Sequence, residues 1–187
     1  MNQYNTEGVN LQTYNNEDYN PGSTLKKTLW YFVNMFVFKT LLPIPSSIKV
    51  SILKLFGASV GQRVVLKPNV NIKYPWFLSL GNDIWIGEDV WIDNLAPVSI
   101  QDNVCISQGA YLLTGSHDYK KSSFDLILGE IVLEDGVWIG AKSIVCPNVR
   151  CKTHSVLAVA SVATSDLEPY TIYQGNPATL KRKREIR

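Results

Sequence analysis

The chain has 187 residues, of which 45% are hydrophobic and 18% are charged, and its formal net charge is +2. These values are typical of one soluble globular domain, with or without an extension, and they exclude the strongly basic balance that favours nucleic acid as a partner. Three cysteines without a CxxC pair, and an N-terminus without a basic and then apolar leader, predict a cytoplasmic protein.

Residues 1–58 are predicted to form an N-terminal arm followed by helices. Ser23 or Thr24 can cap a first helix, which has to end before Pro43. A second short helix is expected between Ser46 and Gly57.

The apolar part of the first helix, Leu29–Leu42, is shorter than the roughly 20 residues that span a bilayer. Two interpretations stay open. The helix can pack on the end of the domain or on a partner subunit. Alternatively, its aromatic residues can lie in the membrane interface, which gives a peripheral contact at the inner face of the membrane.

A pattern of six residues begins at Val60 and continues for about a hundred residues. Twelve of the thirteen hexads start with valine, leucine or isoleucine, which is expected to point inward, and the fifth position is valine, alanine or serine in eleven, where the chain turns. The hexads begin at Val60, Leu66, Ile72, Leu80, Ile86, Ile92, Ile100, Ile106, Leu133, Ile139, Val145, Cys151 and Leu157. A fixed period of six predicts a parallel β-helix in which three short strands close one coil and the coils stack about 4.8 Å apart.

The rhythm slips by two residues before Leu80 and again before Ile100, so about five coils are expected, beginning near Val60, Leu80, Ile100, Leu133 and Cys151. The predicted β-helix covers residues 59–168, and a loop at about 114–130 interrupts its third coil. Residues 169–187 form a C-terminal extension. Its KRKREIR end is interpreted as a solvated helix end or as a patch that attracts phosphate.

Three stretches, WIDNLAPVSIQDNVCISQGAYLLTGSHDY, VWIGAKSIVCPNV and YQGNPATLKRKR, resemble the hexapeptide-repeat acyltransferases. The chain is most similar to the galactoside and maltose O-acetyltransferases, and among these to the colanic-acid-type exopolysaccharide O-acetyltransferases. The resemblance implies an all-β, left-handed parallel β-helix with a helical N-terminal extension. It also implies a homotrimer with active sites between subunits, and acetyl-CoA as acyl donor.

The interrupting loop carries His117, one of two histidines in the chain. A neutral imidazole can take the proton of a hydroxyl that attacks a thioester, and the resemblance places the catalytic histidine on this loop. The resemblance also implies an active-site role for Asn94, which could hold the acceptor or donate to the oxyanion, or could only cap its own turn. Asp93, Asp118 and Tyr119 are candidates for contacts with the acceptor.

For acetyl-CoA the resemblance implies contacts at the corners of the late coils and a basic group near the C-terminus. The residues implied are Trp138, Ala141, Val159, Thr164, Lys181 and Arg182. The late coils depart from the family pattern at Ala160, Ser165 and Thr179. No cluster of metal ligands is apparent, and Trp85 and Trp91 are interpreted as subunit contacts.

The sequence and its family resemblance therefore predict an acetyl-CoA-dependent O-acetyltransferase that acts on a sugar hydroxyl, with exopolysaccharide biosynthesis as the expected setting. His117 is expected to be the general base in a direct transfer within a ternary complex. Acceptors left open are a free sugar, a nucleotide sugar or another small hydroxyl compound. A non-enzymatic structural β-helix is the remaining alternative. A zinc hydratase on the same fold would need three histidines at each metal, and the chain has two.

Overall fold

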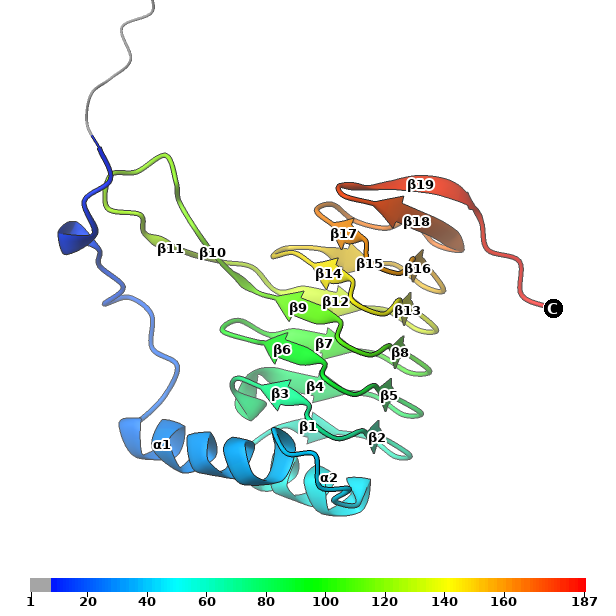
Figure 1. The fold of residues 1–187 in the computed structure, drawn as a ribbon, viewed down its shortest axis with the longest axis horizontal. Helices are drawn as coiled ribbons and strands as arrows, with labels where there is room; N and C mark the ends of the chain where they lie inside the picture. Colours follow the sequence, from blue (N-terminus) through cyan, green and yellow to red (C-terminus); the bar gives the residue numbers. More distant parts are fainter. Residues whose placement is uncertain (1–7) are drawn as a thin grey trace, which may run out of the picture.

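A computed structural model describes residues 8–187, which form a parallel β-helix with helices at one end (Figure 1). Five complete coils and part of a sixth stack on one another, which confirms the predicted fold class. Each coil contributes one strand to each of three parallel sheets, which are the faces of the β-helix. The first face contains β1 (Ser59–Val60), β4 (Leu78–Leu80), β7 (Val98–Ile100), β12 (Ile131–Leu133) and β15 (Arg150–Cys151). The second contains β2 (Val65–Leu66), β5 (Trp85–Ile86), β8 (Cys105–Ile106), β13 (Trp138–Ile139), β16 (Val156–Leu157), β18 (Thr171–Gly175) and β19 (Ala178–Lys183). The third contains β3 (Asn71–Ile72), β6 (Trp91–Asp93), β9 (Tyr111–Leu113), β14 (Ile144–Val145) and β17 (Val162–Ala163).

The predicted starting residues of the hexads are the inward side chains, and parallel pairing aligns them in columns. On the second face, Leu66 pairs with Ile86, Ile86 with Ile106, Ile106 with Ile139 and Ile139 with Leu157. All five side chains are buried. Each aliphatic residue therefore packs on one from the coil before and one from the coil after, so the core is continuous along the β-helix axis.

Glycine follows several hexad starts because the next coil passes too close for a side chain. A Cβ added at Gly87 would lie 2.8 Å from the backbone nitrogen of Gln108, and one at Gly140 would lie 2.6 Å from that of Val159. Both distances are shorter than real Cβ contacts, so the backbone would have to move for any other residue.

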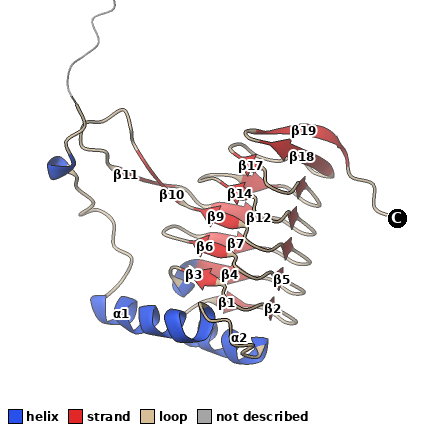
Figure 2. Cartoon of the chain, in the orientation of Figure 1, coloured by secondary structure: helices blue, strands red, loops and turns tan. Residues whose placement is uncertain are grey.

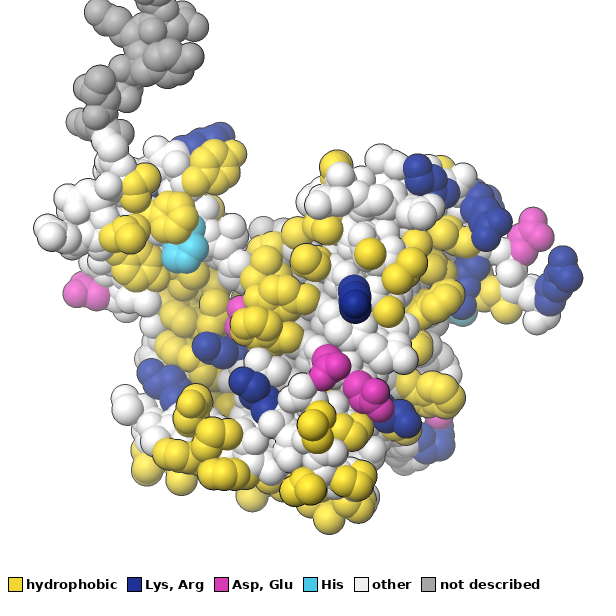
Figure 3. Space-filling model, in the orientation of Figure 1, with side chains coloured by type: hydrophobic (Ala, Val, Ile, Leu, Met, Phe, Trp, Pro, Cys, Tyr) yellow, Lys and Arg dark blue, Asp and Glu magenta, His cyan; other side chains and the backbone are white. Residues whose placement is uncertain are grey.

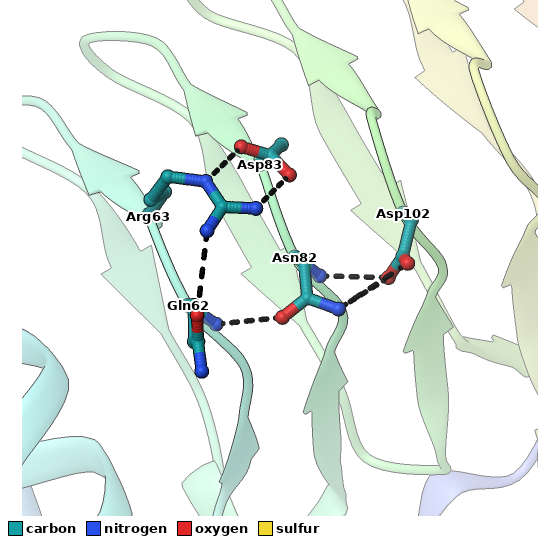
Figure 4. A network of polar contacts seen from close by, with 5 residues as sticks. All are labelled: Gln62, Arg63, Asn82, Asp83 and Asp102. Carbon is teal, nitrogen blue, oxygen red and sulfur yellow. Dashed lines mark hydrogen bonds and ion pairs between the residues drawn. The ribbon is translucent and has the colours of Figure 1, made fainter.

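Side-chain oxygens bridge successive coils at one corner of the β-helix (Figure 4). The Asn82 carboxamide oxygen accepts from the Gln62 backbone N–H at 2.9 Å, and the Asp102 carboxylate accepts from the Asn82 backbone N–H at 2.7 Å. Asp135 repeats the contact on the Asp102 N–H at 2.9 Å. These bonds satisfy backbone donors at the turns, where the parallel strand pairing is interrupted.

Helices cover the open end of the first coil (Figure 2). They are α1 (Thr24–Val33), its π-helical continuation η2 (Asn34–Phe38) and α2 (Ser46–Leu55); the short 3₁₀ turns are η1 (Leu11–Thr13) and η3 (Pro75–Phe77). Ser23 caps α1 by accepting from the Lys26 N–H, as predicted. Trp30 Nε1 donates to the Ile72 carbonyl at 2.9 Å, and buried Lys49 Nζ donates to the Lys67 carbonyl at 2.8 Å. These donors satisfy strand carbonyls that have no preceding coil to pair with.

The C-terminal extension is an antiparallel hairpin of β18 and β19 that continues the second face. Lys181–Lys183 therefore lie on a strand, and the interpretation of this segment as a helix end is wrong. β18 pairs in parallel with β16, which gives the last coil of this face a paired edge. The chain reverses between Gly175 and Ala178, and β19 then pairs with the free edge of β18.

The extra residues of the early coils and the predicted loop share one corner, between the third and first faces. Leu80 pairs with Ile100, 20 residues on, whereas Leu133 pairs with Cys151, 18 residues on. Ile100 pairs with Leu133, so the third coil is longer by the insertion. This insertion folds as an antiparallel hairpin of β10 (Gly115–His117) and β11 (Leu126–Leu128), which projects from the β-helix (Figure 1).

Replacing Asp102 with alanine should lower the free energy of unfolding by about 1–3 kcal/mol, because the Asn82 N–H loses its acceptor at a turn that the strands cannot satisfy. Asp102→Asn keeps one oxygen acceptor and should lose less. Urea unfolding followed by tryptophan fluorescence measures both. Equal stability of Asp102→Ala and the native chain would contradict a stabilising role for the corner bonds.

Candidate active site

The β10–β11 hairpin places His117 outside the β-helix, on an exposed segment. The hairpin begins directly after β9, and Gly129 N–H donates to the Thr114 carbonyl at 2.9 Å, which closes its base. Gly115 lies against Leu95, where an added Cβ would be 2.7 Å from a leucine methyl. The hairpin is thus fixed at its origin, and its far end reaches away from the coils.

One nitrogen of the His117 ring is held by the backbone. Nδ1 lies 2.9 Å from the carbonyl oxygen of Phe124, and the imidazole stacks on the Phe124 ring with centroids 4.5 Å apart and planes 9° from parallel. A carbonyl oxygen only accepts hydrogen bonds, so Nδ1 has to carry the proton. In the neutral ring the lone pair is then on Nε2, which is the tautomer that a general base needs.

The N-terminal arm packs on this hairpin. Asn10 N–H donates to the Ser122 carbonyl at 2.8 Å, and the Tyr14 ring lies 6.0 Å from the His117 ring. On the hairpin itself, the Asp118 carboxylate accepts from the Lys120 N–H at 3.1 Å and so shapes its own turn. Tyr119 is 76% exposed, so its side chain is accessible to an acceptor.

At the base of the hairpin, Asp93 is surrounded by tyrosines. The Tyr111 hydroxyl donates to the Asp93 carboxylate at 3.2 Å, and burial, followed by the charge of Asp93, raises the pKa of Tyr111 to about 12. Burial also raises the pKa of Tyr74, with Asp93 as second cause. Tyr19, from the arm, donates to the Leu95 carbonyl at 2.9 Å, and its pKa is raised by burial, by Tyr74 and by Asp93. The three phenols therefore stay protonated beside one carboxylate.

Asn94 is fully buried and its amide is bonded to the coil before it. Its oxygen accepts from the Tyr74 N–H at 3.0 Å, and its nitrogen donates to the Tyr74 carbonyl at 2.5 Å. His117 lies in the insertion of the next coil, after β9. Of the two roles that the sequence leaves open for Asn94, the hydrogen bonds fit the structural one, because the amide closes the corner that carries Asp93. Its role in the active site stays a prediction.

The residues predicted to bind the coenzyme fall in two groups. Trp138 pairs with Val156, Val156 with Ile172, and Ile172 with Arg182, so Trp138 and Arg182 share one column on the second face. Both side chains are exposed, and Lys181 lies next to Arg182 on β19. Three strand spacings of about 4.8 Å separate the backbones of Trp138 and Arg182.

A groove on the same face begins at Trp138 and runs toward the first coil, away from Arg182. It is lined by Trp85, Cys105, Ser107 and Trp138, and the Trp138 Nε1 donates to the Ser107 hydroxyl at 2.9 Å. The hydrogen bond fixes the indole against the sheet, where it presents an apolar wall beside the groove. The three strands that carry these residues pair in order, β5 with β8 and β8 with β13, so the groove follows the axis of the β-helix.

Ala141 and Val159 lie at the corner that follows the second face, in adjacent coils, and the Ala160 N–H donates to the Ala141 carbonyl at 2.9 Å. Thr164 follows β17 and lies at the next corner, away from the Trp138 column. Ala160 has a φ of 55°, in the left-handed region that favours glycine, which gives a physical reason why the family pattern has glycine there.

A larger groove of about 920 Å³ lies between α1 and the third face. Aromatic side chains of Tyr31, Tyr74 and Trp91 line it together with Lys27 and Lys73. Tyr74 links this groove to the corner that holds Asn94 and Asp93. Within residues 8–187, no group of three histidine, cysteine or carboxylate side chains is placed to hold a metal ion.

The stacked β-helix, interrupted by a hairpin that carries a histidine, has the architecture of the hexapeptide-repeat acyltransferases. The chain is 34% identical over 163 residues to an Escherichia coli protein named provisionally as the colanic acid biosynthesis acetyltransferase WcaF. The aligned region covers 87% of this chain and 90% of that protein. It is 27% identical over 137 residues to the galactoside O-acetyltransferase of the same organism, over 71% of this chain and 67% of the relative. No protein-family model matches the chain.

Solved structures have the same fold. The hexapeptide-repeat acetyltransferase VCA0836 of Vibrio cholerae, in complex with acetyl-CoA, has a TM-score of 0.78 at 22% identity, over 89% of this chain and 93% of that one. A galactoside acetyltransferase in complex with coenzyme A has a TM-score of 0.76 at 22% identity, over 86% and 82%. The chain belongs to the hexapeptide-repeat acetyltransferase family, in the group of the WcaF protein.

Sequence reasoning missed the groups that surround His117 and Asp93. Phe124, Tyr14 and Tyr19 come from segments without periodicity, so no pattern indicated their contacts. The tyrosine content of residues 1–20 was the only available signal.

Asn94→Ala should lower the free energy of unfolding by about 1–3 kcal/mol, since the half-buried Tyr74 N–H loses its acceptor, whereas the Tyr74 carbonyl keeps the Phe77 N–H at 3.0 Å. Asn94→Asp, which retains one acceptor, should be less destabilised at low pH, where the carboxyl is protonated, than at neutral pH. Thermal unfolding monitored by circular dichroism tests this. An Asn94→Ala variant with native stability would assign the amide to catalysis alone.

Proposed function

We propose that this acetyltransferase moves the acetyl group of acetyl-CoA to a hydroxyl of a sugar in exopolysaccharide biosynthesis, with His117 as general base. The observation that carries the proposal is the Nδ1 contact with the Phe124 carbonyl, which leaves the lone pair on Nε2. The likeness to WcaF over 87% of the chain supports the exopolysaccharide setting.

The transfer is direct. His117 Nε2 takes the proton of the acceptor hydroxyl as its oxygen bonds to the thioester carbonyl carbon. The carbon–sulfur bond then breaks, and the imidazolium gives its proton to the departing thiolate. The Phe124 carbonyl accepts from Nδ1 throughout and stabilises the imidazolium that forms between the two proton transfers. The Asp93 corner and Tyr119 contact the acceptor, and Asn94 acts as a positioning residue for that corner.

The second face fits the chemistry of the coenzyme. Lys181 and Arg182 supply positive charge for phosphates at the end of the column, and Trp138 supplies an apolar wall for the pantetheine arm. Ala141 and Val159 border the same face at its corner, and their small or aliphatic side chains leave the backbone accessible. Thr164 is the candidate of this set that lies furthest from the column.

The active site is proposed to lie between subunits of a homotrimer. The His117 hairpin leaves the corner between the third and first faces, whereas the Trp138 column lies on the second face. In a triangular β-helix that face is opposite to that corner. This arrangement favours a site in which the hairpin of one subunit brings His117 to the second face of another.

A second candidate acceptor is a free sugar, a nucleotide sugar or another small hydroxyl compound. The galactoside O-acetyltransferase relative favours it. A thiol-release assay over an acceptor panel, with mass spectrometry of the product, distinguishes the acceptors. Absence of any effect of acetyl-CoA on the melting temperature would instead favour the non-enzymatic structural protein.

His117→Asn should reduce turnover about 10²–10⁴-fold, because the variant lacks the base while keeping a polar side chain of similar size. His154→Asn is the matched control. His154 has a φ of 57°, which asparagine tolerates, and it stacks on Tyr170 away from the hairpin. Thiol release measures both variants. Turnover of His117→Asn equal to that of His154→Asn would refute the base assignment.

Arg182→Ala should raise the KM for acetyl-CoA by about three- to tenfold with little change in kcat, because an exposed cation contributes modestly to phosphate binding. Arg187→Ala, on the same tail beyond β19, is the control and should leave the KM unchanged. An equal effect of both substitutions would indicate a non-specific charge effect.

The same variants test the position of the site. Co-expression of His117→Asn chains with Arg182→Ala chains should give mixed trimers in which some sites combine a native hairpin with a native second face. Activity at low acetyl-CoA should then exceed the sum of the two separate variants. No gain on mixing, for particles shown to be mixed, would place both residues of a site in one chain.

A further inference from the structure

We propose that the helical end of the molecule is a docking surface for an anionic lipid bilayer. This surface, the end plate, consists of the outward sides of α1, η2, α2 and the segment between them. It stands on observations separate from the acetyltransfer proposed above and would hold for any activity of the site.

The end plate is apolar on the side that faces away from the β-helix. Leu25, Leu29, Phe32 and Phe36 recur at spacings of three and four residues, which places them on one side of α1 and η2. Trp30 and Phe38 occupy the opposite side and are buried against the first coil. The core is therefore already covered by one side of the helix, and the other stripe has no intramolecular partner within the described residues.

Neighbouring segments extend the apolar surface. Leu41 is 81% exposed, Leu42 is 63% exposed, and α2 adds Ile48 and Leu55, of which Leu55 is 83% exposed. Figure 3 shows hydrophobic side chains gathered along the edge formed by α1 and α2. An apolar surface of this extent on two adjacent helices is characteristic of an interaction site.

Charge identifies the partner. Between Asp18 and Asp83 the sequence has no aspartate or glutamate, although the whole chain has 16. The same interval contains eight of the 18 lysines and arginines: Lys26, Lys27, Lys39, Lys49, Lys54, Arg63, Lys67 and Lys73. Lys49 is buried and Arg63 pairs with Asp83, which leaves six cations in this interval, four of them on the helices of the end plate or the segment between them. The rest of the chain has ten cations against 16 carboxylates and is negative.

A bilayer with anionic headgroups fits this combination. Short helices with leucine and phenylalanine on one side, with lysines in the same segments and no carboxylate within them, have the composition of helices that lie in the membrane interface. Each lysine near an anionic surface contributes to binding, and the negative remainder of the chain favours the orientation with the end plate toward the lipid. In the described residues no helix has the length and hydropathy to cross a membrane, so the contact lies in the plane of the surface.

Sedimentation of the full chain with vesicles tests the proposal. Binding is expected to phosphatidylglycerol vesicles, with weaker binding to phosphatidylcholine vesicles and a loss of binding as salt is raised. Phe32→Ser with Phe36→Ser should weaken binding at least tenfold. Lys27→Gln with Lys39→Gln should weaken it by about fivefold for each lysine.

The matched control variants change exposed residues that lie away from the end plate. Val9→Ser with Ile186→Ser, and Lys142→Gln with Arg187→Gln, should bind as the native chain does. Circular dichroism confirms that each variant is folded. Equal binding to both vesicle types, no binding, or an equal loss in the controls would overturn the proposal. A change of molecular mass in the phenylalanine variant without a change in vesicle binding would also overturn it, and would assign the end plate to contacts between copies of the chain.

Discussion

The structure depends on in-register parallel pairing between coils, which places an aliphatic side chain directly on the one from the coil before. Leu66, Ile86, Ile106, Ile139 and Leu157 form one such column, and every inward position is buried. Because each coil contacts only its neighbours, stability accumulates along the axis and no coil is stable alone. The same stacking forces glycine where coils approach closely, as at Gly87 and Gly140. It also requires donors and acceptors at the corners, which Asn82 and Asp102 provide.

A stack of coils has two open ends, and this chain closes them by different means. At the first coil, Trp30 and Lys49 donate to strand carbonyls from helices that lie across the end. Burial lowers the pKa of Lys49, so its ammonium depends on those carbonyls for compensation. At the last coil, β18 and β19 continue the second face by strand pairing. A helical closure has an outer side free for another surface, whereas a strand closure brings Lys181 and Arg182 into line with Trp138.

The insertion uses the one corner where the coils differ in length. Adding residues there leaves all three columns in register, so the hairpin can project without disturbing the core. Asp93 and Asn94 belong to the same corner one coil earlier, and Tyr19 from the arm closes over it. The position of His117 is therefore fixed by the hairpin base, by Phe124 and by the arm. Its position at the corner opposite the second face of its own chain supports the proposal of a site shared between subunits.

The sequence by itself determined the β-helix, because a period of six with aliphatic starts specifies inward columns before any contact is known. It also determined the positions of the coils, the site of the insertion and the candidate histidine, since each interrupts or continues that period. Only the tertiary structure decided which atoms meet. It turned the Asn94 amide toward Tyr74 and placed the C-terminal cations on a strand in register with Trp138. It also brought Tyr14 to the hairpin and Tyr19 to the corner that holds Asp93. These contacts join segments of irregular conformation or distant coils, where no local periodicity encodes the partner.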